Sequence, residues 1–159
     1  MPIKRDENIA PLSREHHGAL LFSWKIRQGL KAGISTERIV RFIDWFWQKQ
    51  LHPHQLKEEK YIFHPTDDPL VQRALSEHQQ IQDDITALSE AKDFSDDMFH
   101  AIANLVERHV RFEERVLFPH LEKIIPEDEL VRIGAALHEE EDNDINDNYF
   151  DEFWVKQKK

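Results

Sequence analysis

The sequence predicts an all-α protein, an up-down four-helix bundle with a short extra helix near the C-terminal end. The 159 residues contain only four glycines, and long stretches carry no turn signal. Apolar residues recur at the three-to-four-residue spacing of amphipathic helices. The expected connections are short, which makes neighbouring helices antiparallel. We therefore predict one domain over residues 1–159, with the bundle at about 12–123 and the extra helix and tail at 126–159.

Five helices are expected, at about 13–31, 35–63, 69–91, 95–123 and 126–140. Ser13 is a good N-cap for the first helix, and Ser35 or Thr36 begins the second. Pro69 suits the first turn of the third helix. Pro53 lies inside the second helix, where it removes a backbone hydrogen bond and is expected to kink the helix rather than break it. The tail has aromatic residues that can pack on the bundle, but the sequence does not place it.

Composition excludes several classes of function. The chain has no cysteine, which removes disulfides, thiolate metal sites and iron–sulfur clusters, and fits a reducing compartment. We find neither a signal peptide nor 18 consecutive apolar residues, and so expect a cytoplasmic protein without a membrane partner. The formal net charge of -10 repels phosphate backbones and argues against nucleic acid as a partner.

Two matching helical phrases carry the main functional signal. His54-Gln-Leu-Lys-Glu58 and His109-Val-Arg-Phe-Glu113 each place a histidine and a glutamate four residues apart. Four residues are about one helical turn, so the two side chains project from one face and can hold one ion. Imidazole nitrogen with carboxylate oxygen suits iron, manganese or zinc. The repetition indicates a repeated metal-binding unit.

Helical phase adds two more histidines to these pairs. His16 and His78 each lie at the centre of an apolar stripe, as His54 and His109 do. Counted from the predicted turns, all four histidines fall in one layer of the bundle. One buried histidine alone is more often a hydrogen-bonded core residue than a ligand. Two buried carboxylates in the same layer would be costly without cations, however, so the set favours two metal ions.

At these residues the chain resembles the hemerythrin-like, HHE cation-binding family. The matching pieces span roughly residues 12–122, and they are REHH with His16, His54-x-x-x-Glu58, SEHQQI with His78, and His109-x-x-x-Glu113. The resemblance implies a single hemerythrin-like domain holding a non-haem di-iron site. It further implies that carboxylates and an oxo, hydroxo or water group bridge two iron ions. The implied ligands are His16, His54, Glu58, His78, His109 and Glu113.

The chain departs from the oxygen-carrying hemerythrins, which have an H-x-x-x-H pair on the third helix and a late H-x-x-x-x-D. Ala74 and Gln82 flank His78 here at four residues on either side, and the late pair ends in Glu113. This ligand set is more similar to the branches that repair iron centres or sense iron and oxygen. We therefore predict a di-iron protein that senses or reacts with O₂, NO or peroxide, or that registers iron.

Two alternatives remain beside this prediction. One is an enzyme of iron-centre repair or of peroxide or NO reduction, and the other is a structural bundle with zinc or no metal. The identity of any protein partner does not follow from the sequence.

Overall fold

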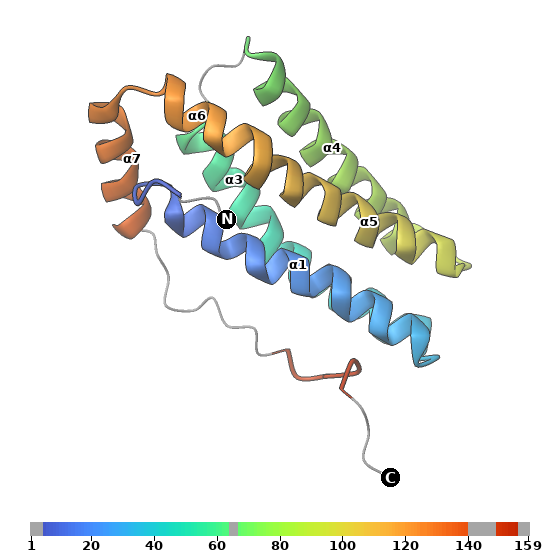
Figure 1. The fold of residues 1–159 in the computed structure, drawn as a ribbon. Coiled ribbons are helices and arrows are strands. Elements are labelled where there is room, and N and C mark those ends of the chain that lie inside the picture. The colour runs from blue at the N-terminus through green and yellow to red at the C-terminus, as the bar shows by residue number, and fades with distance from the viewer. Residues whose placement is uncertain (1–4, 64–66, 140–148, 156–159) are drawn as a thin grey trace.

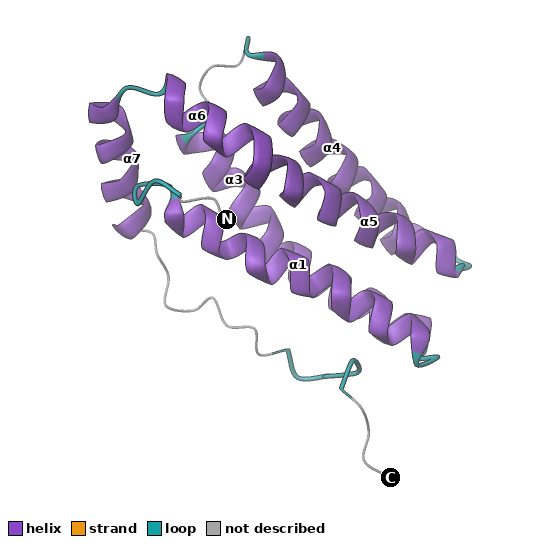
Figure 2. Cartoon of the chain, viewed as in Figure 1, coloured by secondary structure: helices purple, strands orange, loops and turns teal. Residues whose placement is uncertain are grey.

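The computed structural model describes residues 5–63, 67–139 and 149–155, and within these ranges the secondary structure is entirely helical (Figure 2). In chain order the elements are α1 (Ala10–Lys31), α2 (Thr36–Phe46), the π-helix η1 (Trp47–Leu51), α3 (His52–Tyr61), α4 (Pro69–Glu90), α5 (Asp96–Phe112), the π-helix η2 (Glu113–Leu117), α6 (Phe118–Ile124) and α7 (Glu127–Glu139). The predicted all-α class is confirmed. None of these helices combines the length and the apolar character needed to cross a membrane.

Most of the helices join end to end into four long rods. These are α1, then α2–η1–α3, then α4, then α5–η2–α6, and successive rods run in opposite directions (Figure 1). The first rod contacts the second and the fourth, and α4 contacts the same two rods. α7 follows the fourth rod and lies near the start of α1 (Figure 1). There the Asn8 side chain packs so closely on Gly134 that a Cβ at this glycine would meet its Oδ1 at 2.3 Å.

The short connections follow from local chemistry. Gly33 ends α1 with a φ of 67°, the left-handed conformation that glycine adopts at helix ends. Asp68 caps α4 by accepting a hydrogen bond from the Leu70 N–H, with Pro69 in the first turn as predicted. α1 begins at Ala10, earlier than the predicted start at Ser13. The reason is that Pro11 fits the first turn, while the Ser13 hydroxyl bonds Glu114 instead of capping the helix.

A wide π turn precedes a proline in both composite rods. The His52 N–H donates to the Trp47 carbonyl, five residues back, and the Phe118 N–H donates likewise to the Glu113 carbonyl. Pro53 and Pro119 follow directly. A proline lacks an N–H and collides with the carbonyl four residues before it, and we infer that the wider turn accommodates this ring without ending the rod. The second rod is therefore continuous through Pro53, and the alternative of a break does not occur.

Two apolar clusters fill the interior, and a polar layer lies where they meet. In α1 the order is Leu12 in one cluster, then His16, then Ala19 in the other. In α4 the order is Ala74, His78 and Ile81, and the second rod shows the same alternation. In the fourth rod the two clusters meet within the span from His109 to Glu113. The polar layer thus lies between two closely packed apolar regions that keep bulk water away from it.

The described part of the tail packs against the apolar cluster that contains Ala19. Tyr149 and Phe153 are both buried there, and a Cβ on Gly29 would come within 2.7 Å of the Phe153 ring. Arg38 forms two hydrogen bonds with Asp151, at 2.9 and 2.6 Å, which fix the segment to α2. Tyr149 and Phe153 of the tail therefore belong to the core.

We predict that Phe153→Ala destabilises the protein by about 3 kcal/mol, as expected for removal of a buried phenylalanine ring. Phe150→Ala is the matched control, because that neighbouring ring is 86% exposed and its loss should cost little. Urea unfolding followed by circular dichroism measures both. Equal midpoints for the two variants would show that the tail does not contribute to the core.

Candidate metal centre

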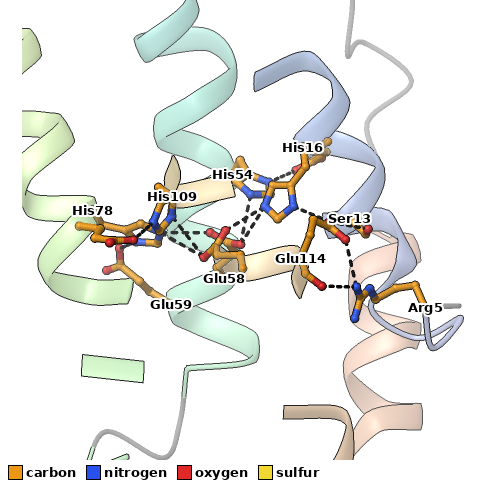
Figure 3. Close-up of polar contacts among 12 residues, drawn as sticks. Arg5, Ser13, His16, His54, Glu58, Glu59, His78, His109 and Glu114 are labelled. Atoms are coloured by element: carbon orange, nitrogen blue, oxygen red, sulfur yellow. Dashed lines mark hydrogen bonds and ion pairs between the residues drawn. The ribbon is translucent and has the colours of Figure 1, made fainter. Parts of the chain in front are cut away.

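The six side chains selected from the sequence meet in the polar layer. α1 contributes His16, α3 contributes His54 and Glu58, and α4 contributes His78. The fourth rod contributes His109 at the end of α5 and Glu113 at the start of η2. All six are buried, and Glu58 and Glu113 are 0% exposed. The four imidazole rings converge on the carboxylates at the centre (Figure 3). The predicted common depth of the histidines is thus present in the fold.

Each central carboxylate lies between histidines of different rods. Glu58 reaches His54 Nε2 at 3.2 Å and His78 Nε2 at 3.1 Å. Glu113 reaches His16 Nε2 at 2.8 Å and His109 Nε2 at 3.3 Å. Longer contacts join His16 with Glu58 at 3.4 Å and His78 with Glu113 at 3.7 Å. Both glutamates are consequently shared between the two halves of the cluster.

Two overlapping groups in this cluster have the composition of metal sites. One is His16, His54, Glu58 and Glu113, and the other is Glu58, His78, His109 and Glu113. Within each group one ligand atom per residue lies within 4.8 Å of the others. We call them the His16/His54 site and the His78/His109 site. Each offers two imidazole nitrogens and two carboxylate oxygens, which is a suitable donor set for iron or another first-row divalent metal.

Four buried atoms of the cluster fit a cation better than they fit one another. His54 Nε2, Glu58 Oε2, His109 Nε2 and Glu113 Oε2 have no hydrogen-bond partner among the described residues. His54 Nε2 lies 3.2 Å from Glu58 Oε2, and His109 Nε2 lies 3.3 Å from Glu113 Oε2. Neither pair is aligned for a hydrogen bond. Buried polar atoms of native proteins are nearly always satisfied. A metal ion at each site would satisfy these four atoms, so the residues present fit the group that the sequence predicts.

A second set of four glutamates surrounds the cluster and was missed by the sequence analysis. Each faces the outer nitrogen, Nδ1, of one histidine. The pairs are Glu15 with His54 at 2.8 Å, Glu59 with His78 at 2.8 Å, Glu77 with His109 at 2.7 Å, and Glu114 with His16 at 2.6 Å. A carboxylate on Nδ1 orients the ring and leaves Nε2 directed to the centre, which is the usual support for metal-ligating histidines.

These outer glutamates obey a simple rule in the sequence. Each is the neighbour in sequence of an inner residue but bonds a histidine on the next rod. The dipeptides Glu15-His16 and Glu77-His78 match each other, as do Glu58-Glu59 and Glu113-Glu114. The repeated acidic neighbour was therefore a visible signal. Each outer glutamate is turned about 100° from its inner neighbour, so the helical phase of its own rod does not place it with the ligands.

The electrostatics of the cluster is governed by the buried carboxylates. Burial lowers the pKa of His78, but the nearby carboxylates of Glu113, Glu58 and Glu59 outweigh this and raise the pKa to about 11. For His109 burial is likewise outweighed by Glu113 and Glu77, which raise the pKa to about 9. Burial and the charge of Glu113 raise the pKa of Glu58, yet His54 and His16 outweigh both and lower the pKa to about 2. Without metal, these shifts favour ionised glutamates and protonated histidines in the layer.

The rods and the buried histidine–glutamate layer together define a helical protein of the carboxylate- and histidine-rich, cation-binding class. Within that class, the family model described as the hemerythrin HHE cation binding domain matches residues 7–121, and the chain belongs to this family. The resemblance seen in the sequence is confirmed. Comparison with curated proteins and with solved structures gives no match.

We predict that the stability of the metal-free protein falls as the pH rises from 6.5 to 9. The histidine pKa values are raised above the ordinary 6.5, so their stabilisation is complete below pH 6.5 and is lost as the pH passes about 9 for His109. The Glu58 contribution is present above pH 4.5 and is lost toward pH 2. The measurement is urea unfolding of chelator-treated protein between pH 5.5 and 9.

In this experiment His109→Gln should flatten the pH dependence, whereas His100→Gln, at an exposed position of α5, should preserve it. A metal-free protein whose stability rises over the same interval would contradict the electrostatic account.

Proposed function

We propose that the chain is a non-haem di-iron protein, an up-down four-helix bundle with an extra C-terminal helix, that senses or reacts with O₂, NO or peroxide. The observation that carries the proposal is the sharing of Glu58 and Glu113 between two histidine pairs. Two carboxylates with no exposed surface are difficult to accommodate unless positive charge lies between them. Two ions at these positions supply that charge.

In this proposal His16 and His54 would hold one ion and His78 and His109 the other, and Glu58 and Glu113 would contribute carboxylate oxygens to both sites. Six nitrogen and oxygen donors are more than a single tetrahedral site uses. The donor set contains no thiolate, since the chain has no cysteine. When bound, a pair of iron ions supplies one-electron redox chemistry and open positions for small ligands.

The surroundings of the layer support a small ligand. Apolar clusters lie on both sides of it, and the rings of Phe118 and Phe63 stack on His16 and His78 with centroids 5.2 and 5.5 Å apart. A closed apolar environment admits a diatomic molecule more readily than a large polar substrate. The outer glutamates add negative charge, which favours the ferric over the ferrous state.

We predict two iron atoms per chain after iron-replete expression, and less than one in Glu58→Ala or Glu113→Ala, because each change removes a donor from both sites. Glu59→Gln and Glu114→Gln are the matched neighbours. They should retain metal with an affinity lowered about 10- to 100-fold, the range typical of outer partners. Elemental analysis and equilibrium dialysis measure these values.

The metal content also decides among the alternatives. Full occupancy by zinc alone would favour a structural role. No more than one firmly held ion in the wild-type chain would contradict the di-iron proposal.

We predict that anaerobically reduced, iron-loaded protein is oxidised irreversibly by air rather than binding O₂ reversibly. The carboxylate-rich surroundings stabilise the additional positive charge of ferric iron. Stopped-flow absorption should show ferric bands that persist when the O₂ is removed. Glu77→Gln should slow the oxidation, because it removes one of the outer charges. A long-lived adduct that releases O₂ under argon would instead indicate an oxygen carrier.

A further inference from the structure

Arg5 connects the segment before α1 to the metal centre. Its side chain is only 8% exposed. One guanidinium nitrogen, Nη2, donates to the Glu114 carbonyl at 2.7 Å and to Glu114 Oε2 at 3.0 Å. The other, Nη1, donates to Glu122 Oε1 at 2.6 Å. The Asp6 N–H donates to the second oxygen of Glu122. Residues 5–8, which we call the N-terminal strap, are thereby fixed to η2 and α6.

Glu114 transmits this fixation to a histidine of the cluster. Its Oε2 faces Arg5, while its Oε1 accepts a hydrogen bond from the Ser13 hydroxyl at 2.6 Å and lies 2.6 Å from His16 Nδ1. Both carboxylate oxygens are thus held, and the carboxylate cannot rotate without breaking several bonds. The Arg5 guanidinium also lies over the Phe118 ring, which stacks on His16. Arg5 therefore contacts two groups beside His16, which are the Phe118 ring and the Glu114 carboxylate that Figure 3 shows between Arg5 and His16.

The other half of the cluster is more open, although its sequence follows the same pattern. Glu59 occupies the position that corresponds to Glu114, and its side chain is 39% exposed against 27% for Glu114. Arg73 contacts an outer glutamate there, Glu77, through a single 3.2 Å bond one turn away on the same helix. The Arg73 side chain is 57% exposed. Solvent screening makes such a pair weak.

We infer that Arg5 is a positioning residue that makes the two metal positions unequal. The inference rests on the proposed di-iron function. Because His16 is already oriented, an ion at the His16/His54 site has less side-chain entropy to overcome than an ion at the His78/His109 site. The ion at the His16/His54 site therefore binds more tightly and leaves more slowly. Through the same contacts, occupancy of this site stabilises the N-terminal strap, since coupling of this kind is reciprocal.

Release of ferrous iron to an excess of chelator tests the inference. Anaerobic stopped-flow measurements on the wild-type chain should show a slow and a fast phase of equal amplitude. His109→Ala should remove the fast phase, which assigns that phase to the His78/His109 site. Arg5→Met should accelerate the slow phase about tenfold, the lower end of the range for outer partners, and leave the fast phase unchanged.

The chain offers a matched control and a second variant. Arg73→Met removes the corresponding cation from the open half and should leave the slow phase unchanged. Glu122→Gln loosens the N-terminal strap without altering Arg5, Glu114 or any inner residue, and should accelerate the slow phase by a smaller factor. It serves as the test if Arg5→Met fails to fold, which circular dichroism establishes.

The outcomes separate the inference from the proposed function. An unchanged slow phase in Arg5→Met, or equal acceleration of both phases, overturns the role of Arg5 while two bound ions still support the di-iron function. A single phase for two ions in the wild-type chain overturns the inequality of the sites. A wild-type chain that holds fewer than two ions overturns the proposed function, and the inference with it.

Discussion

The burial of Glu58 and Glu113 side by side is the constraint on which the rest of the structure depends. Neither has any exposed surface, and each raises the cost of ionising the other. Positive charge must therefore be provided inside the bundle. The four histidines provide it through protons when no metal is present, and metal ions replace those protons when they bind. The raised histidine pKa values and the lowered pKa of Glu58 are two consequences of this one requirement.

The meeting of the inner six residues was predictable because side chains three or four residues apart in sequence lie on the same face of a helix. Spacing places Glu58 on the face of His54, and counting from the turns puts both at the depth of His16. The outer glutamates escaped this reasoning for a physical reason. Glu15 lies off the inward face of its own helix, and its role arises only from His54 on the next rod. Spacing within one helix carries no information on such a contact, although the repeated acidic neighbours indicate where to look.

The departures from the predicted elements also have local causes. The wide turns depend on how each rod accommodates Pro53 and Pro119, and helical periodicity alone does not reveal them. Ser13 has the chemistry of an N-cap, but Glu114, distant in sequence, takes its hydrogen bond. The sequence does not place the tail, because the positions that its aromatic residues occupy in the core depend on contacts with α1 and α2. Phe153 packs on Gly29 beside Ile39, and this site forms only when α1 and α2 pack together.

The outer contacts form a closed ring around the rods. Each glutamate extends from one rod to the histidine of the next rod. The contacts run from α1 to α3, from α3 to α4, from α4 to α5, and from η2 back to α1. The contacts that orient the histidines consequently also join neighbouring rods. Each of these contacts ends at a carboxylate that is nearer the surface than the histidine it holds. The ring is thus a physical route from the state of the buried layer to the outside, and at Glu114 that route continues into the N-terminal strap.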